Sequence, residues 1–292
     1  MPLTTSLEML RDARAGGYAV GAFNAENMEM VQAIMCAAEE ARAPVMIQTT
    51  PGTLRHAPPS VFQAMAAAAA ELRRAPAAMH LDHGDSLECV VQALRAGYTS
   101  IMIDGSKERL EANMAITRSA VELCSACGVP VEGELGRVGG KEDGEDMGEA
   151  GYTEPKEAEV FVAGTGVNFL AVGVGTAHGV YSKEPKIDMT LIKVLRARLP
   201  VPLVLHGASG LADEVVTECV RLGIAKVNFA TELRMAYTRG VREALEARPD
   251  AYDPKYYGKA GRDAVKKAVL QKIALLGSEG KARPCVGRRE GL

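Results

Sequence analysis

The 292-residue sequence has no tryptophan, and aromatic residues make up only 4% of it. It also has no excess of basic residues, because its formal net charge is −3. Surfaces that bind nucleic acids usually combine a basic patch with aromatic side chains that stack on bases. The composition therefore argues against a nucleic-acid partner.

Long apolar runs are absent as well. No stretch approaches the roughly 18 apolar residues that a membrane-spanning helix needs, and residues 1–6 lack the basic and apolar regions of a secretory signal. The six cysteines are scattered, and the single C-x-x-C pair, Cys124 and Cys127, lies in a helical pattern with no second pair nearby. We therefore expect a cytoplasmic protein with reduced thiols and no membrane association.

Hydrophobic residues make up 47% of the chain and charged residues 24%, which suffices for a large core. Short apolar runs alternate with helical patterns, and polar residues gather where the runs end. This alternation predicts a (β/α)₈ TIM barrel over a single domain, residues 1–292, with extra C-terminal helices from residue 231, rather than an open doubly wound sheet. The expected strands are 18–23, 44–48, the run from 76 into His80, 99–103, 129–134, 168–173, 202–205 and 225–229, and the expected helices between them include 28–41, 59–72, 86–96, 107–127, 155–163, 189–199 and 212–222.

Three of the five histidines share one sequence context. His83, His178 and His206 each stand where an apolar strand ends and a glycine follows. The C-terminal ends of barrel strands carry the active site, so these imidazoles are expected on one rim. Three protein ligands with an open fourth position are typical of a catalytic zinc site. His80 is expected inside the barrel and His56 at the surface.

Carboxylates accompany these histidines at the strand ends. Asp82 precedes His83, and adjacent side chains on a strand diverge, so one residue can serve a metal and the other a proton. Glu132 and Glu134 share one face of their strand because strands alternate with period two. The polar, glycine-rich stretch 135–152 follows that strand, and its length and position predict a mobile lid.

Two segments at the ends of the last two strands, the first of which begins with a glycine, indicate a phosphate site. Residues 207–209 and 228–231 could direct backbone N–H groups at a phosphate, and the second segment precedes a helix. The alternative, that both are tight turns only, stays open. A dinucleotide fingerprint over 173–179 is rejected, because its third glycine comes one residue late.

Two other reactions compete with zinc-assisted carbanion chemistry. Lys226 could form a Schiff base, but it lies deeper than the rim, two residues before Asn228 on the same strand face. A zinc hydrolase is the second alternative, because bound zinc can also activate water. The barrel hydrolases with which we compare this chain carry His-x-His on the first strand, whereas residues 18–24 here contain no histidine.

From about residue 18 to 281 the chain resembles the class II, metal-dependent ketose-bisphosphate aldolases, most nearly their tagatose-1,6-bisphosphate branch. Single motifs are weak evidence, but their combination in this order is specific. They are His80-Leu81-Asp82-His83, Met102-Ile103-Asp104-Gly105-Ser106, Glu132-Gly133-Glu134-Leu135-Gly136, Gly139-Gly140-Lys141-Glu142-Asp143, Gly175-Thr176-Ala177-His178-Gly179, His206-Gly207-Ala208-Ser209-Gly210 and Asn228-Phe229-Ala230-Thr231-Glu232.

The resemblance implies a role for each group of residues. One catalytic Zn²⁺ would be held by His83, His178 and His206, and Asp104 and Glu134 would belong to an alternative inner position for a metal or monovalent cation. Asp82 would move the proton of the C4 hydroxyl, and Glu142 the proton on the dihydroxyacetone phosphate carbon. Ser182 separates Lys183 from Tyr181, unlike in many relatives. The positions implied for substrate and phosphate are Asn24, Gly179, Lys183, Gly207, Ala208, Ser209, Asn228, Phe229, Ala230 and Thr231.

The implied reaction is the reversible cleavage of a ketose 1,6-bisphosphate to dihydroxyacetone phosphate and glyceraldehyde 3-phosphate, with zinc stabilising an enediolate. Ala230, together with Gly207-Ala208-Ser209, favours tagatose 1,6-bisphosphate. Fructose 1,6-bisphosphate, or a sulfonated or inositol-derived ketose 1-phosphate, is the alternative substrate. The resemblance also implies a homo-oligomer, dimer or tetramer, and a non-catalytic partner subunit. A non-catalytic barrel subunit is the remaining alternative, and the intact Asp82 argues against it.

Overall fold

The computed structural model describes residues 3–73, 75–142, 145–146, 151–179, 181 and 185–283, with side chains left out at 141–142 and 145–146. Within this part of the chain, eight parallel strands close into a barrel. They are β1 (Val20–Asn24), β2 (Val45–Thr49), β3 (Ala77–Gly84), β4 (Ser100–Ile103), β5 (Val131–Leu135), β8 (Phe169–Val172), β10 (Leu203–Leu205) and β11 (Ile224–Phe229). Their order, β1-β11-β10-β8-β5-β4-β3-β2, confirms the predicted TIM barrel.

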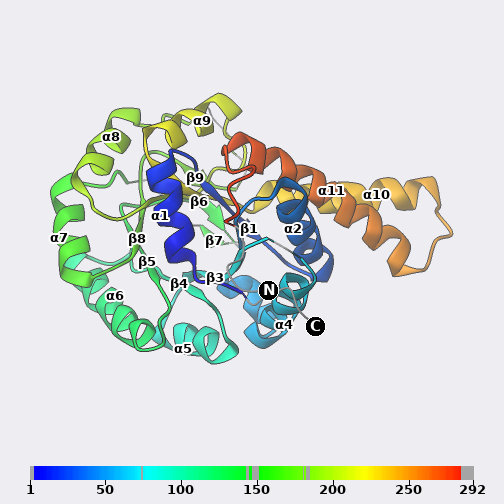
Figure 1. The fold of residues 1–292 in the computed structure, drawn as a ribbon, viewed down its shortest axis with the longest axis horizontal. Helices are drawn as coiled ribbons and strands as arrows, with labels where there is room; N and C mark the ends of the chain where they lie inside the picture. Colours follow the sequence, from blue (N-terminus) through cyan, green and yellow to red (C-terminus); the bar gives the residue numbers. More distant parts are fainter. Residues whose placement is uncertain are drawn as a thin grey trace, which may run out of the picture.

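Helices form the outer layer of the barrel (Figure 1). The first helix closes the end where the strands begin, and its Ser6 Oγ lies 2.7 Å from Oγ of Ser100. Two of the helices begin and end where the apolar periodicity predicts, at residues 28–41 and 59–72. The helices are α1 (Ser6–Gly16), α2 (Met28–Ala41), α3 (Pro51–His56), α4 (Pro59–Leu72), α5 (Leu87–Ala96), α6 (Leu110–Ser125), α7 (Pro155–Thr165), α8 (Met189–Arg198), α9 (Asp213–Leu222), α10 (Thr231–Ala247) and α11 (Pro254–Leu275).

Side-chain capping explains where two of these helices start. Asn27 accepts a hydrogen bond from the backbone N–H of Met30 at the start of α2, at 2.9 Å. Ser86 accepts one from the N–H of Cys89 at the start of α5, at 3.2 Å. Each cap satisfies a backbone donor that the first helical turn would otherwise leave unpaired.

The barrel interior changes from apolar to polar along its axis. Near the closed end, α1 packs on a buried apolar cluster that includes Met46, Met102, Phe169 and Val204. Toward the other end, the interior holds buried charged and polar side chains, whose desolvation has to be offset by hydrogen bonds or charge partners. These buried polar residues are Asn24, Gln48, His80, Asp82, His83, Glu132, Glu134, His206, Lys226 and Asn228.

The stretch 135–152, predicted to form a lid, contains short strands that the sequence did not indicate. Strands β6 (Gly139–Glu142) and β7 (Glu145–Asp146) form an antiparallel pair, and β6 also pairs in parallel with β9 (Ala177–His178). Gly140 faces His178 in this register with a φ of 91°, and a Cβ there would collide with the His178 carbonyl. Glycine therefore permits the pairing.

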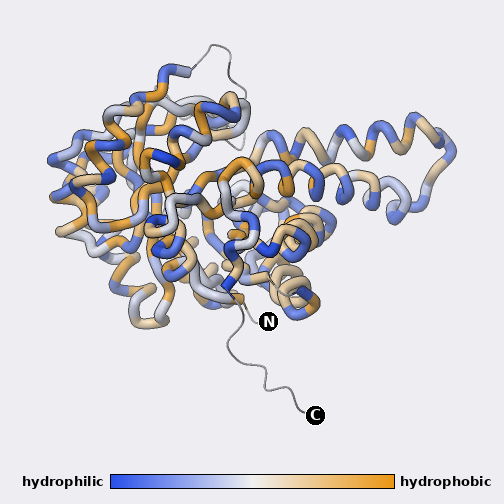
Figure 2. The backbone as a smooth tube through the Cα atoms, turned by 45° about the horizontal axis from the view of Figure 1, so that its top comes forward, coloured by the Kyte–Doolittle hydropathy of each residue, from blue (hydrophilic) through white to orange (hydrophobic). Residues whose placement is uncertain are grey.

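The chain after the barrel forms further helices, as predicted, and the two long helices α10 and α11 run antiparallel. The α10–α11 hairpin projects from the barrel in both overall views, and hydrophilic stretches recur along it (Figures 1 and 2). Among the described residues, no helix combines the length and the apolar character that crossing a bilayer requires.

Candidate metal and substrate site

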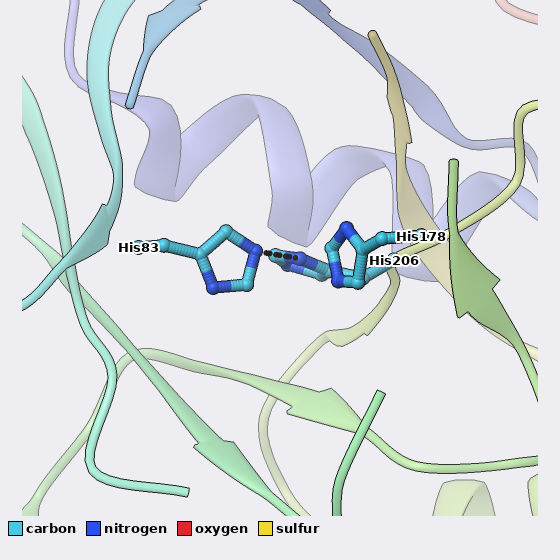
Figure 3. A group of neighbouring side chains, drawn as sticks. All are labelled: His83, His178 and His206. Carbon is cyan, nitrogen blue, oxygen red and sulfur yellow. Dashed lines mark hydrogen bonds between the residues drawn. The ribbon is translucent and has the colours of Figure 1, made fainter. Parts of the chain in front are cut away.

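The three predicted zinc ligands converge at the mouth of the barrel. His83 comes from β3, His178 from β9 and His206 directly follows β10, so segments far apart in sequence meet here (Figure 3). Their ring centroids lie 4.6 to 5.9 Å apart. One ligand atom from each imidazole can be chosen so that all three lie within 4.8 Å of one another.

Carboxylates orient two of these imidazoles from behind. Asp104 Oδ2 lies 2.8 Å from His83 Nδ1, and Glu132 Oε1 lies 2.8 Å from His206 Nε2. A carboxylate accepts a hydrogen bond from the N–H of the ring nitrogen that it contacts, which leaves the opposite ring nitrogen unprotonated and available to a metal. The opposite nitrogens, His83 Nε2 and His206 Nδ1, lie 2.8 Å apart. They face the same point between the rings.

This arrangement fits a zinc ion. Three neutral imidazoles make up the donor set, and the carboxylate partners behind His83 and His206 are typical of zinc-bound histidines. Burial lowers the pKa of His206, which favours the neutral ring that a metal needs. The three rings leave room for a further ligand, because Asp82 and a pocket adjoin them.

The inner position implied for a second cation also exists as a cluster. His83, Asp104 and Glu134 can bring one ligand atom each within 4.8 Å of the others. Burial and the nearby Asp104 raise the pKa of Glu134 well above its usual value, and its Oε2 has no hydrogen-bond partner among the described residues. Both cation positions would use His83, through different ring nitrogens.

Asp82 is buried and held by three amide groups. Its Oδ2 accepts hydrogen bonds from Asn24 Nδ2 at 3.2 Å and from Gln48 Nε2 at 3.0 Å. Its Oδ1 accepts one from Asn228 Nδ2 at 3.0 Å. Gln48 also donates to the side-chain oxygen of Asn24 at 2.7 Å, so the donors brace one another. The carboxylate is therefore fixed beside the metal ligands rather than solvated.

The backbone between Asp82 and His83 departs from a regular strand. His83 has a φ of 49°, in the left-handed region that residues other than glycine seldom adopt, and the β3–β4 register shifts between Leu81 and Gly84. The two side chains diverge as predicted. Asp82 faces the amides of β1, β2 and β11, whereas His83 faces Asp104 and the other histidines. Unusual backbone of this kind tends to occur at functional sites.

A pocket beside the histidines collects most of the predicted substrate residues. Two sets of close contacts shape the wall of this pocket. Gly207 has a φ of 65°, and a Cβ there would lie 2.6 Å from the Ala177 carbonyl oxygen. Tyr181 Oη donates to the Gly207 carbonyl at 2.7 Å and accepts from the Ala177 N–H at 2.8 Å. The lining residues are Asn24, Asp82, His178, Gly179, Gly207, Ser209, Asn228, Ala230, Thr231 and Arg234.

Four predicted substrate or proton-transfer residues do not appear in that lining. Ala208 is buried next to it, and the Phe229 ring stacks on Phe23, with centroids 5.8 Å apart, in the layer between barrel and helices. Only the backbone of Phe229 could therefore reach a ligand. Lys183 and the side chain of Glu142 lie outside the described residues.

Three functional side chains were missed at the sequence level. Gln48 ends a predicted strand, and Glu132 was seen only as facing the same way as Glu134, so strand position was the available signal for both. Arg234 lies one helical turn into α10, and its sequence context predicts nothing about the pocket. It pairs with Glu26, Nη2 to Oε1, at 2.6 Å.

Comparison with known proteins agrees with this geometry. The family model described as fructose-bisphosphate aldolase class-II matches residues 4–281. The YdjI aldolase from Escherichia coli K12 is 36% identical, with a TM-score of 0.84, over 96% of this chain and 100% of that one. A Coccidioides immitis protein assigned as a fructose-1,6-bisphosphate aldolase is 32% identical, with a TM-score of 0.87, over 95% and 98%.

A third solved structure, the fructose-bisphosphate aldolase from Campylobacter jejuni, has the same fold at 22% identity, with a TM-score of 0.82 over 96% of this chain and 97% of that one. Together, the fold and the site place the chain in the class of parallel barrels that carry a histidine triad at the mouth. The chain belongs to the class II fructose-bisphosphate aldolase family. It is accordingly a metal-dependent lyase that acts on phosphorylated ketoses.

Proposed function

We propose that the protein cleaves tagatose 1,6-bisphosphate reversibly to dihydroxyacetone phosphate and glyceraldehyde 3-phosphate. The observation that carries the reaction is that Asp82, held by three amides, lines the same pocket as His178 of the histidine triad. A zinc ion held by His83, His178 and His206 would withdraw electrons from the ketone and so lower the barrier to carbanion formation. Fructose 1,6-bisphosphate and other ketose 1-phosphates are the alternative substrates.

Asp82 is proposed to take the proton from the C4 hydroxyl while the C3–C4 bond breaks. A general base must be within hydrogen-bond reach of its proton and must be held in place. Asp82 lines the pocket, and Asn24, Gln48 and Asn228 restrict its rotation. In the reverse direction the same carboxyl returns the proton to the forming C4 hydroxyl.

Glu142 is proposed to move the proton on the carbon of dihydroxyacetone phosphate. What supports this is the path of the backbone, because β6 pairs with the strand that carries His178. The register places Gly140 opposite His178, two residues before Glu142. A residue on that strand can therefore approach the metal site. Glu142→Gln would be expected to slow proton exchange on dihydroxyacetone phosphate more than it slows zinc binding.

The C1 phosphate is proposed to bind where β10 and β11 end. Gly179, Gly207 and Ser209 line the pocket there, together with the first residues of α10. The N-terminus of a 17-residue helix carries unpaired N–H groups and partial positive charge, which suit a phosphate. Ser209 Oγ accepts from the Ala230 N–H at 3.3 Å and so holds the two segments together. Lys183 is retained in this proposal as a further contact.

The position of Arg234 supports the proposal that the pocket binds a second anionic group of the substrate. Among the described residues that line the pocket, it is the one cationic side chain. Its guanidinium contacts Glu26 through Nε and Nη2, and about a third of the side chain is exposed, at 34%. A phosphate that approaches from the pocket could bind the guanidinium group, because such groups have five N–H donors in a planar array.

The substrate test is a comparison of kcat/KM for tagatose 1,6-bisphosphate, fructose 1,6-bisphosphate and a fructose 1-phosphate that bears another anion at C6. The two bisphosphates differ in configuration at C4, next to Asp82 and the metal, so discrimination depends on local geometry. We expect tagatose 1,6-bisphosphate to be preferred. A tenfold preference for fructose 1,6-bisphosphate, about 1.4 kcal/mol, would overturn the tagatose assignment and leave the aldolase reaction intact.

We also propose that residues 1–292 act as one domain and that the chain assembles into a dimer or tetramer. The projecting α10–α11 hairpin supports the second proposal, since it leaves long helical surface away from the barrel (Figure 1). Sedimentation equilibrium would give the mass of the assembly. Assay of the purified chain with and without cell extract would test for a non-catalytic partner subunit, which would raise its activity.

A further inference from the structure

A buried lysine lies below the metal site and is not part of it. Lys226, on β11, is fully buried, and its Nζ donates to Glu132 Oε2 at 2.7 Å. The other oxygen of that carboxylate, Oε1, lies 2.8 Å from Nε2 of His206. Glu132 therefore bridges Lys226 to a predicted zinc ligand. Lys226 does not line the substrate pocket, so it is not placed to form a Schiff base.

The hydrogen bonds continue from Lys226 to the closed end of the barrel. Nζ of Lys226 lies 3.3 Å from His80 Nε2, and His80 Nδ1 lies 2.7 Å from Ser100 Oγ. Ser100 in turn contacts Ser6 of α1. An ammonium group has no acceptor, so His80 Nε2 must accept and its Nδ1–H must donate to Ser100. Burial and Lys226 hold the pKa of His80 well below its usual value, which agrees with a neutral ring.

The orientation of Glu132 determines which nitrogen His206 presents to the metal position. A carboxylate can only accept here, so the proton of His206 lies on Nε2 and Nδ1 is left toward His83. Burial alone would raise the pKa of Glu132, but the charge of Lys226 and the hydrogen bond from His206 keep it below the usual range. Lys226 also fixes Oε2, which turns Oε1 toward the ring.

Stability by itself does not account for this buried pair. Two buried charges are costly to desolvate, and apolar residues of similar volume often replace such a pair with no loss of stability or with a gain. The pair sits directly behind one predicted zinc ligand, and among the described residues its ion-pair partners outside the pair are the two neutral histidines, His80 and His206. Its placement therefore favours a role in the metal site.

We propose that Lys226 is a positioning residue for the metal site, acting through Glu132 to hold His206 with Nδ1 toward the zinc position. The inference rests on the proposed zinc site and adds a residue that never contacts zinc or substrate. Outer partners of metal-bound histidines are typically worth 10- to 100-fold in metal affinity. Lys226→Met should therefore weaken zinc binding by about that factor, although every ligand remains.

The test is a double-mutant cycle in zinc affinity. Zinc dissociation constants would be measured by chelator competition, without substrate, for the wild type, Lys226→Met, Glu132→Leu and the double variant, with folding checked by circular dichroism. Because Lys226 acts through Glu132, the lysine substitution should cost about 10- to 100-fold alone and nothing further in the Glu132→Leu background. Equal losses in both backgrounds, or no loss alone, would overturn the proposal.

Three further variants separate the causes of any loss. Met46→Ala truncates the apolar interior away from the hydrogen bonds and should leave zinc affinity within twofold, whereas a loss as large as that of Lys226→Met would overturn the proposal. Lys226→Leu also lacks a donor to Glu132 and replaces Lys226→Met in the cycle if the latter does not fold. His178→Ala removes a ligand outside the chain of hydrogen bonds. If it retains zinc, the metal site itself is wrong, a failure distinct from that of the lysine.

Discussion

Nε2 of His83 lies 2.8 Å from Nδ1 of His206, although 123 positions separate the two residues. Each ring has its other nitrogen against a buried carboxylate, Asp104 for His83 and Glu132 for His206. Two acceptor nitrogens therefore point at each other, an arrangement that a shared cation stabilises and that repels without one. The metal site is thus prepared from both sides before any substrate arrives.

Removal of the metal should abolish cleavage. Dialysis against a chelator is expected to eliminate aldol cleavage, and added Zn²⁺ should restore it. The reason is that the three imidazoles would hold the zinc ion that withdraws electrons from the ketone. Borohydride with substrate should have no effect, since Lys226 is bound to Glu132 and His80 below the pocket. Chelator resistance combined with borohydride inactivation would contradict this account and support a Schiff base.

Loss of one amide beside Asp82 should lower turnover. Asn228→Ala removes the donor to Asp82 Oδ1, and hydrogen bonds to charged groups are worth about 1.5–3 kcal/mol, so kcat should fall about 10- to 100-fold. Asn168→Ala is a matched control, because Asn168 accepts from the Val131 N–H at the opposite end of the barrel. Steady-state kinetics should show a change in kcat for Asn228→Ala alone. Equal effects would mean that Asn228 serves folding only.

Arg234→Met should discriminate between substrates with one and two phosphates. If Arg234 binds the second anionic group, KM for the bisphosphate should rise about tenfold or more, while KM for a ketose 1-phosphate changes little. Arg262→Met provides a control of similar exposure, 35% against 34%, on a helix outside the pocket. A KM increase of the same size for both substrates would contradict the assignment.

Gly207→Ala should destabilise the protein more than an equivalent substitution elsewhere. Gly17 and Gly207 have nearly the same φ, 68° and 65°, yet a Cβ at Gly17 meets no atom within 4 Å whereas one at Gly207 lies 2.6 Å from the Ala177 carbonyl oxygen. Left-handed backbone costs about 1–2 kcal/mol in both variants. Urea unfolding should therefore show a clearly larger loss for Gly207→Ala. Equal losses would mean that the loop moves aside.

The barrel and the metal ligands were predictable because both depend on local patterns. Short continuous apolar runs and helices with period 3.6 are visible in sequence, and His83, His178 and His206 each mark a strand end. The strand ends of a parallel barrel meet at one rim, so the sequence places these ligands together without any distance being known. The convergence of the three histidines into a candidate metal site therefore followed from fold class and position.

The parts that could not be predicted depend on contacts between distant segments. The pairing of β6 with β9 requires the close approach of Gly140 to His178, and residues 139–146 lack the continuous apolar run of a barrel strand. Gln48 and Glu132 acquire their roles from Asp82 and His206 across the barrel. Arg234 reaches the pocket because of the direction in which α10 leaves β11. Sequence spacing carries no record of such pairings.

The substitution Asp82→Asn is the sharpest test of the proposal that Asp82 is the general base of the cleavage reaction. The zinc-loaded variant and the wild type would be compared for cleavage of tagatose 1,6-bisphosphate, with zinc content measured in the same samples. We predict bound zinc in both proteins and a fall in kcat of about 10²–10⁴-fold in the variant, the usual contribution of a general acid–base group. Near-normal cleavage by zinc-loaded Asp82→Asn would contradict the proposed role of Asp82 and the mechanism built on it.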